Sequence, residues 1–223
     1  MSRPVIFHGT PMTPRAALLD VLAGRAGCVS FYRPDDVSAV EQVCPSIMYD
    51  NGAYSFWKQA LKAGKEWAGD RDWTTYYAWI DERVWQDGRW AVIPDRPGAP
   101  SQLNDALLNE WPHGTAKGAP LWHMGNPIER LGRLCEKYER VCLGWTEGDD
   151  AVGSDAYHRR MDDVAALFGN TWPNIHMMRG VAVARDYPFR QRRQHVTRTE
   201  RVEAGQLSGY HAGRSLAGTA GIC

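Results

Sequence analysis

Three ionisable residues stand at the ends of short apolar segments, where they could act together on a ligand. Asp50 ends "SIMYD", Asp95 ends "RWAVIPD", and His123 lies within "APLWHMG". Carboxylate and imidazole groups hydrogen-bond to polar ligands and transfer protons to and from them. If these segments are parallel strands of a barrel, their carboxyl ends meet at one face and present the three side chains to one ligand. The ends of other such segments add His8, Gly144 and Arg179.

Each of these residues also has a purely structural interpretation. Asp50 begins "DNG", which is typical of tight turns, and Asp95 begins the proline-rich loop "DRPGAP". His123 could be a buried histidine with its hydrogen bonds satisfied, and His8 and His176 could be structural in the same way. Three polar groups that converge are more informative than any one of them. We therefore predict a site that contains Asp50, Asp95 and His123.

Seven apolar segments alternate with helical patterns, and such alternation predicts parallel strands connected by helices. Apolar residues at helical spacing and capping signals, such as Ser101, mark the helices. We expect helices over residues 13–24, 35–43, 56–67, 101–111, 126–138 and 154–169. We expect strands over residues 4–10, 27–34, 46–55, 89–95, 119–125, 140–145 and 174–183.

This order predicts an α/β fold of the (β/α)8 TIM-barrel type, because its strand-plus-helix units repeat about every 25 to 35 residues. A doubly wound sheet is the competing fold, but no GxGxxG follows the first strand. The eighth strand belongs just after residue 184, where an arginine-rich segment stands instead. We expect a barrel over residues 1–189 whose eighth strand is missing or disrupted, and an irregular segment over residues 190–223.

Composition narrows the classes of function. The 26 basic and 26 acidic residues cancel, so a nucleic-acid partner would have to meet a local basic patch. The five cysteines form no CxxC pair, which argues against a disulfide framework or a compact zinc site. No apolar run approaches the roughly 18 residues that a membrane span needs. We expect a cytoplasmic protein with no metal, no cofactor and no membrane partner.

Several segments together resemble a known family. They are "IMYDNGAYSFW", "AVIPD", "PLWHMGNPIERLGRLCEKYERVCLGW", "GSDAYHRRMDDVAALFG" and "IHMMRGVAV". This pattern resembles the tRNA-guanine transglycosylase (queuine tRNA-ribosyltransferase) superfamily, and within it the short phage and bacterial branch linked to 7-deazaguanine bases in DNA. The resemblance covers residues 4 to 189. It implies base exchange: a carboxylate attacks the anomeric carbon of the sugar, guanine leaves, and a second base displaces the enzyme.

The resemblance also implies roles for individual residues. Asp50 matches the carboxylate that contacts the base and transfers a proton, and Asp95 matches the carboxylate that binds the Watson–Crick edge of the purine. His123 stands where the family has a base-reading amide, and Leu143 and Gly144 match the backbone that contacts the base. The cysteine cluster of the tRNA enzymes is missing, which favours DNA over tRNA as the substrate.

The nucleophile that the resemblance implies is absent. It is an aspartate in an "ADST"-like segment after "YPF", whereas this chain reads "YPFRQRRQHVTRTE", with no acid from Arg190 to Gln194. Asp186, before "YPF", is the nearest alternative. Permitted codons for residues 190 to 200, followed by the first base of the Arg201 codon, translate as ASADSTSLAQN when they are read from the second base. We therefore hypothesise a one-base shift of the reading frame near residue 190.

Three functions remain open from the sequence. The first is guanine/7-deazaguanine exchange in DNA, by an active enzyme or by a remnant that lacks its nucleophile. The second is an inactive barrel that binds a purine or nucleic acid through a basic C-terminal segment, since five arginines lie between residues 190 and 201. The third is an unrelated barrel hydrolase, such as a nucleosidase.

Overall fold

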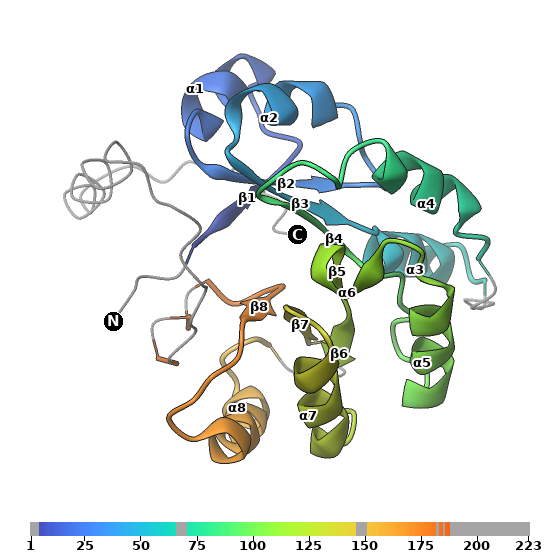
Figure 1. Ribbon diagram of the computed structural model, residues 1–223, viewed down its shortest axis with the longest axis vertical. Helices are drawn as coiled ribbons and strands as arrows, with labels where there is room; N and C mark the ends of the chain where they lie inside the picture. Colours follow the sequence, from blue (N-terminus) through green and yellow to red (C-terminus); the bar gives the residue numbers. More distant parts are fainter. Residues whose placement is uncertain (1–4, 66–70, 146–150, 182, 185, 188–223) are drawn as a thin grey trace.

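The chain forms two parallel sheets surrounded by helices (Figure 1). A computed structural model describes residues 5–65, 71–145, 151–181, 183–184 and 186–187. One sheet has the order β1 (Phe7–Gly9), β2 (Ala26–Ser30), β3 (Ser46–Asp50), β4 (Arg89–Val92) and β5 (Gly118–Ala119). The other has the order β6 (Leu121–His123), β7 (Val141–Gly144) and β8 (Ile175–Met177).

Pro120 separates the two sheets, because β5 ends and β6 begins on either side of it. On the β5 side, the Ala119 carbonyl accepts a hydrogen bond from the amide of Ile93 at 2.9 Å. On the β6 side, the Pro120 carbonyl accepts one from the amide of Cys142 at 2.9 Å. Proline has no amide hydrogen to donate, so it suits the point where a strand changes partners.

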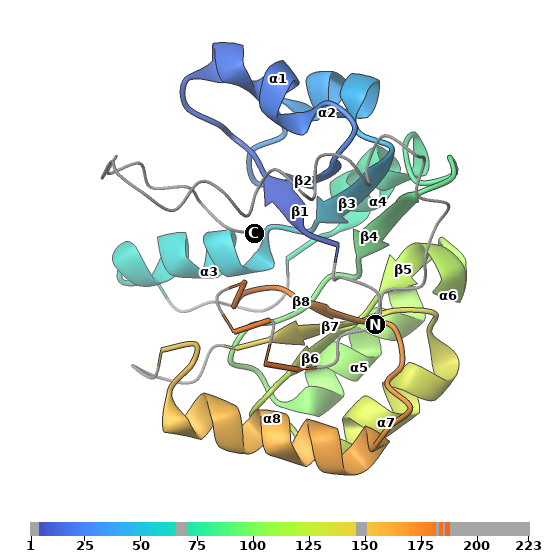
Figure 2. The ribbon, with the colours of Figure 1, turned by 90° about the vertical axis from the view of Figure 1, so that its left-hand side faces the viewer.

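The helices lie around the outside of the sheets. They are α1 (Leu18–Leu22), α2 (Val37–Val43), α3 (Ala53–Lys62), α4 (Thr74–Asp81), α5 (Ser101–Glu110), α6 (Gly114–Lys117), α7 (Ile128–Lys137) and α8 (Asp155–Phe168). Figure 2 shows α1 and α2 on one side of the strands, and α7 and α8 on the opposite side. In α8 the hydroxyl of Ser154 caps the first turn by accepting a hydrogen bond from the amide of Tyr157.

The core has two parts, because alternate residues of a strand point to opposite faces. The larger cluster packs strand residues such as Val29, Ile47 and Ile175 against the helices. The smaller cluster joins both sheets and holds Cys28, Met48, Trp90, Val92, Ala119 and Cys142, with Phe7, Leu121 and Met178 packed against it. The rings of Phe7, Trp90 and His176 meet there, with centroids 5.3 to 5.5 Å apart.

The α/β class with parallel strands is confirmed. A closed barrel is not seen among the described residues, where β1 pairs with β2 alone and β8 pairs with β7 alone. The segment over residues 190–223 lies outside the described part of the chain, so its expected irregularity stays a prediction.

Some expected boundaries were wrong. The strand predicted over 174–183 ends at Met177, because Gly180 takes a φ of +108° and its carbonyl accepts a hydrogen bond from the amide of Val183 in a turn. The helix predicted over 13–24 begins as a 3-10 turn at Arg15–Ala17, and Thr13 does not cap it. Helices α4 and α6 were not predicted from the sequence.

Two further expectations concern composition. Among the cysteines that the structure describes, Cys44, Cys135 and Cys142 are free thiols. In the same part of the chain, every helix is too short or too polar to pass through a bilayer. The localisation of the protein stays a prediction.

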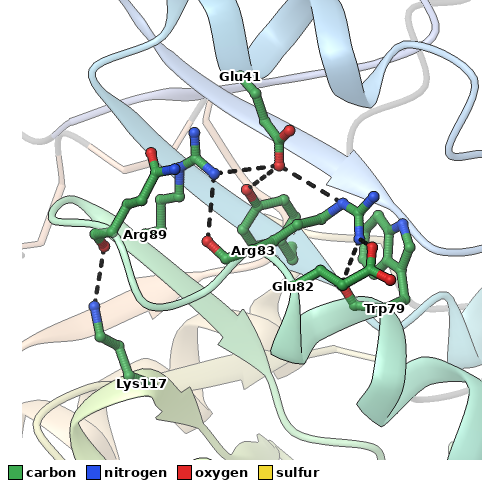
Figure 3. A network of polar contacts seen from close by, with 8 residues as sticks. Glu41, Trp79, Glu82, Arg83, Arg89 and Lys117 are labelled. Carbon is green, nitrogen blue, oxygen red and sulfur yellow. Dashed lines mark hydrogen bonds and ion pairs between the residues drawn. The ribbon is translucent and has the colours of Figure 1, made fainter.

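A half-buried carboxylate connects α2, β3 and the entry to β4 (Figure 3). Oε1 of Glu41 accepts a hydrogen bond from the hydroxyl of Tyr49 at 2.7 Å. The same oxygen lies 3.3 Å from Nη1 of Arg89 and 3.6 Å from Nε of Arg83. One carboxylate oxygen therefore faces a hydroxyl and two guanidinium groups in a site that is only partly exposed to water.

We expect Glu41→Ala to lower the free energy of unfolding by about 1–3 kcal/mol, because it leaves two guanidinium groups and a hydroxyl without their shared acceptor. Urea unfolding measures the change. Glu82→Ala is the matched control, since Glu82 pairs with Arg83 while 69% exposed, and exposed pairs contribute under about 1 kcal/mol. Equal losses in the two variants would contradict the role given to Glu41.

Candidate functional site

A cavity of about 290 Å³ lies at the carboxyl ends of the strands. Its wall contains five of the six residues that the sequence placed at strand ends: Asp50, Asp95, His123, Gly144 and Arg179. The sixth, His8, is not among the residues that line it. The predicted convergence of Asp50, Asp95 and His123 is therefore present in the structure.

The side chain of Asp50 is held by two hydrogen bonds. Its Oδ2 accepts from the hydroxyl of Ser30 at 2.8 Å and from the amide of Gly52 at 3.1 Å. Ser30 and Asp50 are paired in register at the ends of β2 and β3. Gly52 has a φ of +74°, and a Cβ there would lie 2.9 Å from the amide nitrogen of Tyr32, so the turn requires glycine. The "DNG" turn thus shapes the site itself.

The surroundings of Asp50 raise its pKa to about 6. Burial is the main cause, and the negative charge of Asp95 adds to it. The hydrogen bonds from Ser30 and Gly52 and the charge of Arg179 act in the opposite direction. A carboxyl group with a pKa near neutrality can both donate and accept a proton under physiological conditions, which suits general acid–base catalysis.

Asp95 is buried and contacts two neighbours with different oxygens. Its Oδ1 accepts a hydrogen bond from Nδ2 of Asn51 at 2.9 Å, and its Oδ2 lies 3.1 Å from Nε2 of His123. Asn51 is itself fixed, because Nδ2 also donates to the carbonyl of Ile93 and Oδ1 accepts from the amide of Ala53. Sequence reasoning treated Asn51 only as a turn residue, although it orients the carboxylate.

The imidazole of His123 is 4% exposed. Its Nδ1 is buried and has no hydrogen-bond partner among the described residues. A buried nitrogen without a partner costs free energy, so the structural interpretation of a fully satisfied core histidine does not fit His123. A bound ligand could supply the missing partner.

Leu143 and Gly144 end β7 but face different surroundings. Gly144 lines the cavity, whereas the side chain of Leu143 packs in the core between strands and helices. The carbonyl of Leu143 accepts a hydrogen bond from the amide of Met178, and that of Gly144 accepts one from the amide of Met124. Of the two residues, the cavity wall contains Gly144 alone.

Aromatic and cationic side chains complete the wall. Tyr32, Tyr54 and Trp145 line it together with Arg33 and Arg179. The Cζ atom of Arg179 lies 3.8 Å from the centroid of the Tyr54 ring, which is a cation–π contact. Sequence reasoning missed Ser30 and these tyrosines. Their position in the sequence could have identified them, because each lies at a predicted strand end or within a few residues of one.

The remaining candidates lie elsewhere. His176 packs between Phe7 and Trp90, and burial, with the charge of Arg140, lowers its pKa to about 3, so it is neutral at physiological pH. Asp186 is exposed and does not line the cavity. The positions from Arg190 to Gln194, where a nucleophile was expected, lie outside the described residues.

Within the described ranges, no group of three His, Cys, Asp or Glu side chains is placed to hold a metal ion. Comparison of the chain with family models, curated proteins and solved structures found no match. The cavity and its side chains are therefore the features that bear on function.

The raised pKa of Asp50 predicts a pH-dependent cost to stability. Well below its ordinary pKa of 3.8, the carboxyl group is protonated in both the folded and unfolded chains. As the pH rises towards 6, the unfolded chain loses the proton first, so the folded chain is destabilised by up to about 3 kcal/mol. Asp50→Asn removes this cost. We expect the variant to gain stability over the parent as the pH rises from 4 to 7.

Urea unfolding at several pH values measures this difference. Asp87→Asn is the control for replacing an aspartate by an amide, because Asp87 is exposed and lies outside the cavity wall. If the Asp50→Asn difference stayed constant between pH 4 and 7, or followed the control, the raised pKa would be wrong.

Proposed function

We propose that the cavity binds a purine base and that the chain is a guanine/7-deazaguanine transglycosylase of DNA, or a remnant of one that lacks its nucleophile. The observation that carries this proposal is the meeting of Asp50, Asp95 and His123 in one cavity. Its volume of about 290 Å³ lies just below the range for small-molecule pockets, which begins near 300 Å³.

The chemistry of guanine matches this set of groups. The base carries N–H donors on its Watson–Crick edge, which carboxylates accept, and acceptors at O6 and N7, which N–H groups can satisfy. Asp95 is already oriented by Asn51, and His123 has an unpartnered ring nitrogen. When the bond from the anomeric carbon to N9 breaks, the base leaves with an extra electron pair and needs a proton. Asp50, with a pKa of about 6, can supply one.

We further propose that the strands form a (β/α)8-type barrel, open at the position of the eighth strand. Two features support it: the inner cluster joins side chains of both sheets, and the parallel strands present their carboxyl ends to one cavity. In such barrels the active site lies at that face. β5 and β6 lie on either side of Pro120 and together fill one strand position of such a barrel, so β8 fills the seventh. The missing eighth strand would pair with the edges of β1 and β8 that are free among the described residues. DNA as the substrate and a cytoplasmic location belong to the same proposal.

The second candidate is a purine- or nucleic-acid-binding protein without catalysis. Among the described residues that line the cavity, Asp50 and Asp95 are the only acids. Both have roles at the base, so neither is left to attack the sugar. This favours binding without exchange for the chain as it stands. A nucleosidase remains the third candidate, with Asp50 activating water in place of the second base.

We expect Asp50→Asn and Asp95→Asn each to weaken the binding of guanine by about 10- to 150-fold, because a hydrogen bond to a charged group contributes about 1.5–3 kcal/mol. Titration calorimetry or ligand-observed NMR gives the dissociation constants. Asp87→Asn, outside the cavity, should bind like the parent. Parent-like binding by both cavity variants would show that the assigned roles are wrong.

We expect the 223-residue chain to show no base exchange, because a covalent route needs a nucleophile. The described part of the cavity wall has no acid besides Asp50 and Asp95, and residues 190–194 contain none. Incorporation of labelled guanine into duplex DNA measures exchange. A chain with ASADSTSLAQN from position 190, followed by the shifted reading, should incorporate the label. Exchange by the present chain that Asp186→Asn abolishes would instead make Asp186 the nucleophile and refute the frame shift.

A further inference from the structure

Two arginines line the same cavity but come from different sheets. Arg33 follows β2 of the five-stranded sheet, and Arg179 follows β8 of the three-stranded sheet. Arg33 is exposed and Arg179 is half-buried, whereas Asp95 and His123 are buried. Asp95 therefore lies deeper in the cavity than either arginine, whereas Asp50 is half-buried like Arg179.

Neither guanidinium group makes a hydrogen bond or a salt bridge with another residue in the described part of the chain. Arg179 is nevertheless held in place, because it stacks on Tyr54 with its Cζ 3.8 Å from the ring centroid. A cation–π contact does not use up the N–H groups of the guanidinium as hydrogen-bond donors. The N–H edge of a guanidinium matches the geometry of two phosphate oxygens.

The order of charges restricts what can fill the cavity. An anion placed beside Asp50 and Asp95 would meet like charges in a site with little water, which is costly. A neutral polar group suits the interior, and an anionic group suits the arginines. A nucleotide has both parts in one molecule, a neutral base and a phosphate joined through the sugar.

We propose that Arg33 and Arg179 form a phosphate-binding rim, so that the ligand of this cavity is a phosphate ester of a purine nucleoside and not the free base or nucleoside alone. This rests on the proposed function of the interior as a purine site. The phosphate can belong to a free nucleotide or to a nucleic-acid strand. The competing interpretation is that Arg179 acts only as the counter-charge of Asp50 and Asp95.

The test compares four ligands by titration calorimetry at low and raised salt: 2′-deoxyguanosine, its 5′-monophosphate, thymidine 5′-monophosphate, and the single-stranded trinucleotide d(TGT). We expect deoxyguanosine monophosphate to bind about tenfold more tightly than deoxyguanosine, and this gain to shrink as salt rises. Arg179→Gln should abolish most of the gain, because it should weaken the binding of deoxyguanosine monophosphate by a larger factor than that of deoxyguanosine. Arg179→Lys should keep part of it.

Arg133→Gln is the matched control, because Arg133 is exposed on α7 and does not line the cavity. The rim is refuted if nucleoside and nucleotide bind equally to the parent, or if Arg179→Gln weakens both ligands by the same factor. If thymidine and deoxyguanosine monophosphates bind equally, with Arg179 dependence, the rim stands and the purine site is wrong. Tighter binding of the trinucleotide than of the mononucleotide identifies a strand as the source of the phosphate, and equal binding identifies a free nucleotide.

Discussion

The contact on which the site depends is the packing of Phe7, Trp90 and His176 between the two sheets. These rings come from the first and fourth strands of one sheet and the last strand of the other, and their centroids are 5.3 to 5.5 Å apart. The two sheets do not hydrogen-bond to each other in the described residues, so side-chain packing must hold their inner faces together. Large edge-to-face rings do this well, because they bury much apolar area with specific geometry. His176 can take part because burial keeps its imidazole neutral.

The same packing produces the chemistry of the cavity. Trp90, Met48 and Cys142 belong to the apolar cluster that joins the inner faces of the sheets, and Val92 of that cluster also lines the cavity. Apolar neighbours cannot replace the water that an ionised carboxylate loses, so the pKa of Asp50 rises. The hydrogen bonds from Ser30 and Gly52 limit that rise and fix the carboxylate in one orientation. Burying Asp50 therefore lowers the stability of the folded chain near neutral pH, and it gives the site a group that can transfer protons at that pH.

Local patterns explain what could be predicted from the sequence. The ends of apolar runs placed Asp50, Asp95, His123, Gly144 and Arg179, and all five line one cavity because parallel strands end on the same side. Contacts between distant segments explain what could not. Asn51 reads as a turn residue until Asp95 is placed beside it, and the outward direction of Leu143 depends on strand register. The early end of β8 follows from the positive φ of Gly180, which apolar patterning does not reveal.

The net charge of the chain is zero, but the charged side chains of the cavity are not evenly placed. Equal numbers of acidic and basic residues give a net charge of zero, which by itself argues against an anionic partner. In the cavity, however, Asp95 is buried and Arg33 is exposed, while Asp50 and Arg179 are both half-buried. Each part of this arrangement disfavours one kind of ligand: the acids exclude a phosphate from the interior, and a neutral base leaves the arginines without a partner. A molecule with a neutral hydrogen-bonding end and an anionic end satisfies both, so local charge order is a better guide to the ligand than net charge.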